Sequence, residues 1–217
     1  MSALLETERL ALRRWEASDA TSAYGIFAAP RVAPWLSPAF PVPGSPEDMR
    51  STLNRWHDEK GRPDAGCVGH WALQTRTQPV LVGGLSLQYA PAGSESLSIA
   101  WVLSPDCWGR GYAAEAGEAL MRWAMHEHGV REVFAFMPTD NARAVATARR
   151  IGMDWVTELG HLTHRNYQVY RLRHADLWYD RSRDRTVNAA ADIGPMSTLT
   201  GSVQTSSQRT DDPGPAS

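Results

Sequence analysis

Lysine and cysteine are the residue types that this sequence most clearly lacks. Only Lys60 among its 22 basic residues is a lysine, and Cys67 and Cys107 are its two cysteines. Two cysteines are too few to build the disulfide framework of a small secreted protein. The excess of arginine is consistent with a GC-rich coding sequence, and a surface selected for planar, bidentate hydrogen-bond donors is the alternative.

The sequence also has no long apolar run and little net charge. No stretch approaches the roughly 18 apolar residues that a membrane-spanning helix needs, and the first ten residues, MSALLETERL, lack the basic start and apolar core of a secretory signal. The formal net charge of −2 excludes a polyanion-binding protein that relies on bulk positive charge. We therefore expect a cytoplasmic protein without nucleic-acid or membrane partners.

The composition changes sharply after Trp178. Residues 179–217 contain almost no large apolar side chains and are rich in Ser, Thr, Asp, Pro and Gly. Such a segment buries too little surface to offset the entropy lost when it is ordered. We predict one folded domain over residues 1–178, long enough for a sizeable core, and a disordered tail over residues 179–217.

Strand and helix patterns alternate within the predicted domain. Strands are expected at 9–15, 67–75, 79–89, 94–103, 131–137, 154–161 and 167–173, and helices at 19–29, 46–60, 111–128 and 141–151. Ser18 and Asp19 are expected to cap the first helix, and Ser45 the second. Gly83 and Gly84 predict a bulge or a close backbone approach within a strand. The order of elements predicts an α+β, or mixed α/β, fold around a central sheet.

The stretch WVLSPDCWGRGYAAE, residues 101–115, carries the clearest chemical signal. A strand ends there, Gly109 and Gly111 follow, and a helix with small side chains begins at once. The first turn of a helix offers unpaired backbone N–H groups and the positive end of a dipole, and glycines let a ligand approach the backbone. With Arg110 beside them, these amides predict a pyrophosphate site, and a plain strand-to-helix turn is the alternative. The spacing fits neither a nucleotide phosphate loop nor a Rossmann fingerprint.

This stretch resembles the acetyl-CoA-binding motif of the GNAT N-acetyltransferase superfamily, Gln/Arg-x-x-Gly-x-Gly/Ala. Trp108, Gly111 and Ala113 stand at the three specified positions of this motif. With Trp at the first of them, the chain resembles the RimJ/RimL-like branch, the ribosomal-protein N-terminal acetyltransferases and their relatives. Further pieces follow in the same order: RLALRRW near the start, the Glu115-Ala116 pair, and a helix that begins at Asn141 and ends in Ile151-Gly152-Met153. The resemblance covers residues 5–178.

The resemblance implies a mostly antiparallel, twisted central sheet flanked by helices, in which two strands splay apart to hold acetyl-CoA as a co-substrate. No cluster of His, Cys, Asp or Glu in the sequence has metal-ligand spacing, so we expect no metal. The strand carrying Trp101 would hold the pantetheine arm, the amides of 109–113 would hold the pyrophosphate, and Asn141 would bond to the pantetheine or cap its helix. The implied coenzyme-binding residues are Trp101, Val102, Leu103, Trp108, Gly109, Arg110, Gly111, Tyr112, Ala113 and Asn141.

The usual catalytic positions of the superfamily are changed in this chain. Many members carry Glu on the strand before the loop, where this chain has Ser98, and Glu95 lies an odd number of residues earlier, toward the other face. The family's Tyr seven residues after the Asn is Ala148, and the RimL-like Ser three residues after it is Ala144. Ser98 and Glu95 are the catalytic candidates on this strand.

Three hypotheses for the proton transfer therefore stay open. A base could come from elsewhere, with candidates His70, His161, His164, Tyr89 and Tyr167. Ser98 and backbone carbonyls could instead support a water relay, which suits an α-amine of pKa about 7.7–8.0 better than a lysine amine near 10.4. Finally, the chain could bind acyl-CoA without transferring it.

The acceptor expected for an active enzyme is a protein N-terminus or a small-molecule amine, and a homodimer is among the assemblies that the resemblance allows. The proline-rich loop 30–46 carries Trp35 and Phe40, which could admit an apolar acceptor or a larger acyl chain, or could simply cover the core.

Overall fold

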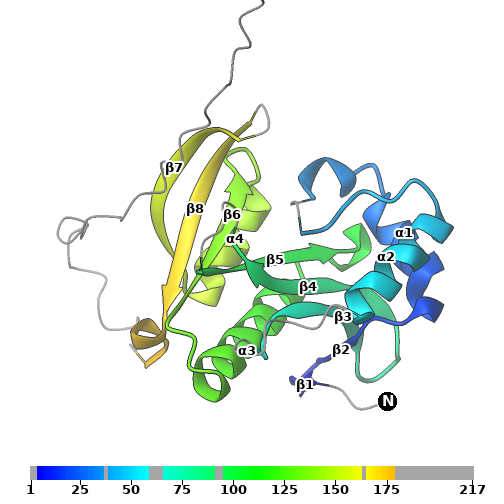
Figure 1. Cartoon of the computed structure of the whole chain (residues 1–217), viewed down its shortest axis with the longest axis horizontal. Helices are drawn as coiled ribbons and strands as arrows, with labels where there is room; N and C mark the ends of the chain where they lie inside the picture. Colours follow the sequence, from blue (N-terminus) through cyan, green and yellow to red (C-terminus); the bar gives the residue numbers. More distant parts are fainter. Residues whose placement is uncertain (1–3, 37–38, 59–65, 91–94, 163–164, 179–217) are drawn as a thin grey trace, which may run out of the picture. The chain divides into compact units, whose positions relative to one another are not determined.

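The computed structural model describes residues 4–36, 39–58, 66–90, 95–162 and 165–178. Figure 1 shows a twisted sheet with helices on both sides. The strands are β1 (Leu5–Glu6), β2 (Leu10–Arg14), β3 (Gly69–Thr75), β4 (Leu81–Tyr89), β5 (Leu97–Leu103), β6 (Glu132–Pro138), β7 (Asp154–Leu162) and β8 (Arg165–Arg173). The helices are α1 (Ala20–Phe27), α2 (Pro46–Asp58), α3 (Tyr112–Glu127) and α4 (Ala142–Ile151), with short 3-10 turns η1 (Ala17–Asp19), η2 (Ala33–Trp35), η3 (Pro105–Cys107) and η4 (His174–Trp178).

The eight strands form one sheet in the order β1-β2-β3-β4-β5-β6-β8-β7. Strands β5 and β6 pair in parallel, and every other neighbouring pair is antiparallel. The parallel step follows from the connection, because α3 crosses over between β5 and β6, whereas the other neighbours are joined by turns or by returning segments. The expected α+β fold with a mostly antiparallel sheet is confirmed.

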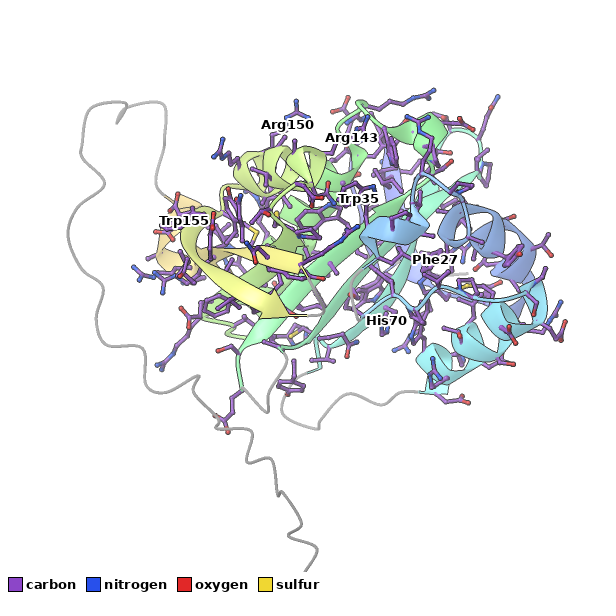
Figure 2. The ribbon with its side chains drawn as sticks, turned by 90° about the horizontal axis from the view of Figure 1, so that it is seen from above. Phe27, Trp35, His70, Arg143, Arg150 and Trp155 are labelled. Atoms are coloured by element: carbon purple, nitrogen blue, oxygen red, sulfur yellow. The ribbon has the colours of Figure 1, made fainter. Side chains whose placement is uncertain are left out.

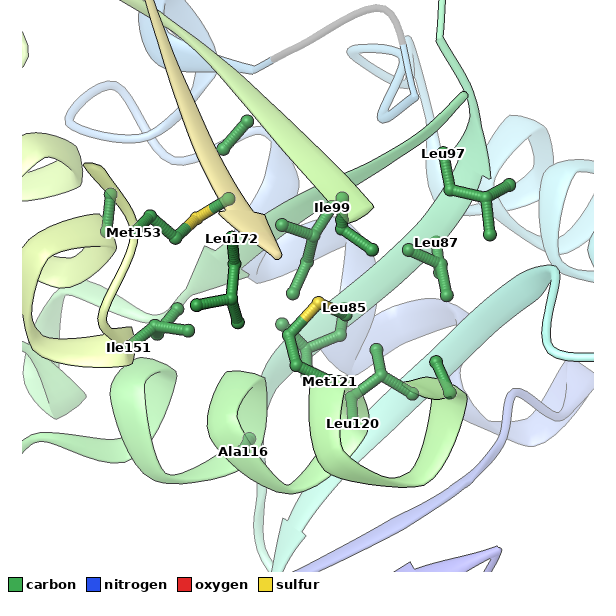
Figure 3. Packing of buried hydrophobic residues seen from close by; sticks show 14 of the residues in the cluster. Leu85, Leu87, Leu97, Ile99, Ala116, Leu120, Met121, Ile151, Met153 and Leu172 are labelled. Carbon is green, nitrogen blue, oxygen red and sulfur yellow. The ribbon is translucent and has the colours of Figure 1, made fainter. Parts of the chain in front are cut away.

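Each face of the sheet buries its own apolar cluster. On one face, the small and aliphatic residues of α3 and α4 pack on β4, β5 and β6, where Leu120 and Met121 point toward Leu85 and Ile99 (Figure 3). On the other face, α1 and α2 enclose an aromatic cluster around Phe27. The alternation of side chains along each strand divides its residues between these two cores.

The paired glycines of β4 mark a place where the backbone is crowded. A side-chain carbon on Gly83 would lie 2.0 Å from the carbonyl oxygen of Val102, and one on Gly84 would lie 2.6 Å from the indole ring of Trp15. The register between β3 and β4 also shifts here, because Leu73 pairs with Gly83 and the next residue pairs with Leu81. The expected bulge and close approach are both confirmed.

The structure corrects some of the expected ends and caps. The two-residue strand β1 was not expected, since two residues show no periodicity. Asp19 does not cap α1 through its side chain; its carboxylate instead pairs with both terminal nitrogens of Arg13 at 2.7 Å. A bidentate charged pair is stronger than a cap hydrogen bond to a neutral amide. The cap at Ser45 is confirmed, with its hydroxyl accepting from the Asp48 amide at 3.1 Å.

No helix in the described ranges is both long enough and apolar enough to cross a membrane. Within the same ranges, no group of three His, Cys, Asp or Glu side chains is placed to hold a metal ion. The predicted tail at 179–217 and the last two residues of the helix expected at 46–60 lie outside the described residues.

His70 on β3 is a buried titratable group within the aromatic core. Its ring stacks on Trp56 with centroids 4.2 Å apart, Nε2 lies 3.2 Å from the carbonyl oxygen of Ala39, and Nδ1 lies 3.3 Å from the side-chain amide of Gln88. Burial lowers the pKa of His70 from 6.5 to about 4, and the charge of Arg55 adds to that lowering, while the Ala39 carbonyl opposes it. His70 is therefore neutral at pH 7.

This buried histidine predicts a loss of stability in mild acid. The unfolded chain binds a proton near pH 6.5 and the folded chain only near pH 4, so the free energy of unfolding falls between these values, by about 2 kcal/mol from pH 7 to pH 5. Urea unfolding at the two pH values measures the loss. His70→Gln should remove most of it, whereas His57→Gln, at an exposed position of α2, should leave it unchanged. An equal pH dependence in wild type and His70→Gln would contradict this assignment.

Candidate active site

The site begins where β5 and β6 stop pairing. These parallel strands pair at two positions, Leu97 with Val133 and Ser98 with Phe134. Beyond that point β5 stays paired with β4 as far as Leu103, and β6 stays paired with β8 as far as Pro138. The facing edges of β5 and β6 therefore diverge, and their backbone groups are not paired with each other.

A cavity of about 330 Å³ lies at this divergence. Its walls come from five places: the ends of β5 and β6, the loop and first turn of α3, one face of α4, the segment around η2, and β8. The lining residues are Val32, Trp35, Leu36, Ile99, Ala100, Trp101, Val102, Leu103, Cys107, Trp108, Gly109, Gly111, Tyr112, Ala113, Ala114, Ala135, Phe136, Met137, Pro138, Asn141, Arg143, Ala144, Ala146, Thr147, Arg150 and Tyr167.

The glycine loop presents the N-terminus of α3 to this cavity. Gly109 has φ +76° and Gly111 has φ +79°, conformations that favour glycine over residues with a side chain. Gly111 is the N-cap of α3, so no side chain caps the helix and its first amides keep their hydrogen-bonding capacity. The Trp108 indole N–H donates to the carbonyl of Leu103 at 3.0 Å, which ties the loop to the end of β5.

Glu115 fastens this loop to the N-terminal part of the chain. Its carboxylate accepts hydrogen bonds from the Thr7 hydroxyl at 2.5 Å and from the Arg9 amide and side chain at 3.0 and 2.6 Å. Arg9 also donates to the carbonyl of Arg110 at 2.9 Å. Burial alone would raise the pKa of Glu115, but the hydrogen bonds from Thr7 and Arg9 outweigh it and hold the pKa below its ordinary value. The carboxylate is thus ionised, and through Thr7 and Arg9 it holds the loop and the start of α3 in place.

Positive charge gathers along the cavity. The guanidinium groups of Arg31 and Arg143 lie over the ring of Trp108, with centroid distances of 4.7 and 4.5 Å. Arg143 and Arg150 line the cavity from α4, and both lie on the upper side of the molecule in Figure 2. Of the described residues that line the cavity, none is Asp or Glu. The site therefore favours an anionic ligand.

The structure brings nine of the ten expected coenzyme residues to this cavity. They are Trp101, Val102, Leu103, Trp108, Gly109, Gly111, Tyr112, Ala113 and Asn141. The tenth, Arg110, is in the loop but does not line the cavity; its carbonyl is held by Arg9. Asn141 caps α4, because its side-chain oxygen accepts from the Ala144 amide at 3.1 Å. Their role as coenzyme ligands stays a prediction.

The catalytic candidates are distributed differently. Ser98 lies where β5 and β6 still pair, with its hydroxyl 3.4 Å from the Gln88 carbonyl, and Glu95 is exposed just before β5. Neither is among the residues that line the cavity. Among the alternative bases, Tyr167 lines the cavity, and His70 and Tyr89 do not. The side chains of His161 and His164 lie outside the described residues.

The two aromatic residues of the proline-rich loop have separate positions. Trp35 lines the cavity, whereas Phe40 is buried in the aromatic core beside Phe27. Sequence reasoning also missed the face of α4 formed by Arg143, Thr147 and Arg150. Their spacing of four and then three residues is typical of one helical face and could have identified it.

Comparison with known proteins agrees with this geometry. A family model for the acetyltransferase (GNAT) domain matches residues 9–154. An uncharacterized N-acetyltransferase of Bacillus subtilis, YnaD, is 22% identical over 149 residues, which cover 69% of this chain and 81% of the relative. A GNAT-family acetyltransferase structure from Bacillus anthracis superposes with a TM-score of 0.68 at 20% identity, covering 79% of this chain and 98% of the other.

A ribosomal-protein alanine acetyltransferase from Vibrio fischeri is also similar in structure, with a TM-score of 0.63, 15% identity, and coverage of 80% and 97%. At this identity the likeness shows a shared fold. Membership of the RimJ/RimL-like branch therefore stays a prediction.

The glycine loop can be tested with a matched pair of substitutions. A side-chain carbon added at Gly109 or at Gly129 meets no atom within 4 Å, and both glycines have positive φ, +76° and +64°. Gly109→Val and Gly129→Val should therefore lose similar thermal stability. Only Gly109→Val should weaken acetyl-CoA binding, by about tenfold or more, because its side chain covers amides that face the cavity. Calorimetric titration measures this affinity, and equal affinity in the two variants would refute the site.

Proposed function

This chain belongs to the GNAT acetyltransferase family, and on that premise we propose that it transfers the acetyl group of acetyl-CoA to a primary amine, by direct attack within a ternary complex. The observation that carries the proposal is the divergence of β5 and β6 after two paired residues, next to the uncapped N-terminus of α3. Membership of the family makes the chain an acetyl-CoA-dependent acyltransferase.

The residues of the cavity fit the coenzyme. The pantetheine arm, which carries amide groups, can add as a short strand between the diverging edges of β5 and β6. The pyrophosphate suits the amides between Gly109 and Ala113, and Arg143 and Arg150 supply cations for the remaining phosphate charge. When bound, acetyl-CoA supplies an activated thioester, and the chain's own residues orient it and manage protons.

The reaction forms a bond between the amine nitrogen and the acetyl carbon and breaks the bond from that carbon to sulfur. The nitrogen gives up one proton, and the leaving thiolate takes one up. A backbone N–H near Leu103, at the end of β5, is suited to polarise the carbonyl. We assign protonation of the thiolate to Tyr167, because it is the alternative candidate that lines the cavity. Ser98 and Glu95 do not line the cavity, so either residue would act through water.

The composition of the cavity also bears on which amine reacts. None of its described lining residues is a carboxylate that could deprotonate an ammonium group. An amine of low pKa is partly neutral at pH 7 and needs no strong base, which favours an α-amine over a lysine side chain. The acceptor is accordingly an α-amine, on a protein N-terminus or on a small molecule. A cytoplasmic location and a homodimer stay predictions.

A catalytically silent acyl-CoA-binding module is the second candidate function. The observation that favours it is that the family's usual acid and base positions hold Ala144, Ala148 and Ser98. Ala144 and Ala148 are buried on α4, where they contribute to the core.

Release of free thiol from acetyl-CoA, measured with a panel of amines, separates the two functions. The transferase should release thiol only when an amine is added, and a peptide with a free N-terminus and no lysine should react faster than the same peptide with a blocked N-terminus and one lysine. Coenzyme binding without thiol release for any amine would instead establish the silent module. A clear preference for the lysine side chain would contradict the α-amine assignment.

Tyr167→Phe tests the proposed proton donor. Removing the hydroxyl should lower kcat by about 100-fold, because a positioned acid contributes at least that much to such a step. The KM for acetyl-CoA should change little, since the ring remains. Tyr89→Phe, on β4 and outside the cavity, is the control and should retain kcat. Equal kcat values for the two variants would exclude Tyr167 as the donor.

A further inference from the structure

One wall of the cavity is built by two separate segments, and both are distant in sequence from the glycine loop. Val32, Trp35 and Leu36 contribute one part and Tyr167 on β8 the other. Arg165 joins them, since its guanidinium donates to the carbonyl of Pro34 at 3.1 Å and lies 5.2 Å from the ring centre of Trp35. Figure 2 shows Trp35 in the middle of the molecule, below Arg143 and Arg150 in that view.

This wall is apolar and aromatic. Val32 and Leu36 are aliphatic, and Trp35 presents a half-buried indole whose position is set by Arg165. An indole held in this way offers a large apolar surface at little cost in side-chain entropy, and it favours offset or edge contacts with another ring. The wall therefore suits a ligand with an aromatic group.

The absence of carboxylates from the described lining disfavours a second class of acceptor, the polyamines. Its charged lining residues are Arg143 and Arg150, and among the described lining residues there is no carboxylate. A polyamine keeps one or more ammonium groups charged while another amine reacts. Those charged groups would find no carboxylate partner among the described lining residues, and a charge that leaves water without a partner is disfavoured.

The size of the cavity limits the acceptor further. Its volume of about 330 Å³ is at the low end of the roughly 300–1,000 Å³ of pockets that hold one drug-sized ligand. The same space must also receive the acetylated end of the pantetheine arm. What remains beside the thioester admits a small group that carries the amine.

We propose that the acceptor is a small aromatic α-amine whose ring packs against Trp35. This inference rests on the proposed acetyl transfer and names the substrate class for it. The same lack of carboxylates that disfavours a polyamine also favours an amine of low pKa, so the charge and the base chemistry point to one acceptor.

Four amines test this assignment: phenylalaninamide, alaninamide, spermidine, and a pentapeptide that begins with phenylalanine. The first two share the same α-amine and differ by the ring. Phenylalaninamide should exceed alaninamide in kcat/KM by about tenfold or more, the gain expected from burying a phenyl ring. It should also exceed spermidine and the pentapeptide.

Trp35→Ala and Trp155→Ala form the matched pair of variants. Trp155 lies on β7 outside the cavity and is 56% exposed. Trp35→Ala should lower kcat/KM for phenylalaninamide by about tenfold, leave that for alaninamide nearly unchanged, and weaken calorimetric binding of the product N-acetylphenylalaninamide. Trp155→Ala should match wild type. Leu36→Glu, checked for folding by its thermal transition, should raise activity with spermidine, because it adds a carboxylate to the wall.

The outcomes separate this inference from the proposed function. If acetyl-CoA binds and no amine releases thiol, the acetyl transfer itself fails. If thiol is released but spermidine or the pentapeptide is preferred, or if Trp35→Ala leaves the ratio between phenylalaninamide and alaninamide unchanged, the transferase stands and the aromatic acceptor is refuted.

Discussion

The parallel pairing of β5 with β6 over only two residues is the constraint on which the site depends. Because β5 stays bound to β4 and β6 stays bound to β8, both strands keep their direction after they part, and the space between them has walls of regular backbone. The crossover through α3 makes the pairing parallel and also brings the glycine loop to the end of β5. One topological step thus supplies both the opening between the strands and the amides that we propose hold the coenzyme's phosphates.

Contacts around the space between β5 and β6 fix its shape and leave the space itself open. Glu115 connects the loop to Thr7 and Arg9, far from it in sequence, and the indole of Trp108 bonds to the end of β5. Because Gly83 and Gly84 have no side chains, β4 can lie close against β5 and the aromatic core. A rigid frame of this kind lowers the entropy that a ligand loses on binding, because the donors are already in place.

Periodicity along the sequence predicted nearly every strand and helix, because each alternating or amphipathic run faces one of the two cores. It could not predict that β5 and β6 are parallel and then diverge; that expectation came from the family resemblance of residues 101–115. Nor could it rank Tyr167 above His70, since both lie on strands and only tertiary packing puts one at the cavity and the other under Trp56. Asp19 was assigned to the wrong partner because capping preferences take no account of a nearby arginine.

The hydrogen bond from Arg165 to Pro34 bears on how the choice of acceptor could change among related enzymes. It joins Pro34 in η2, outside the sheet, to Arg165, the first residue of β8, 131 residues away in the chain, and neither belongs to the glycine loop. In the proposed site, the residues that contact the acceptor therefore differ from the glycine-loop residues proposed to hold the coenzyme. A few substitutions in these segments could therefore change the acceptor, while the diverging strands and the glycine loop stay the same.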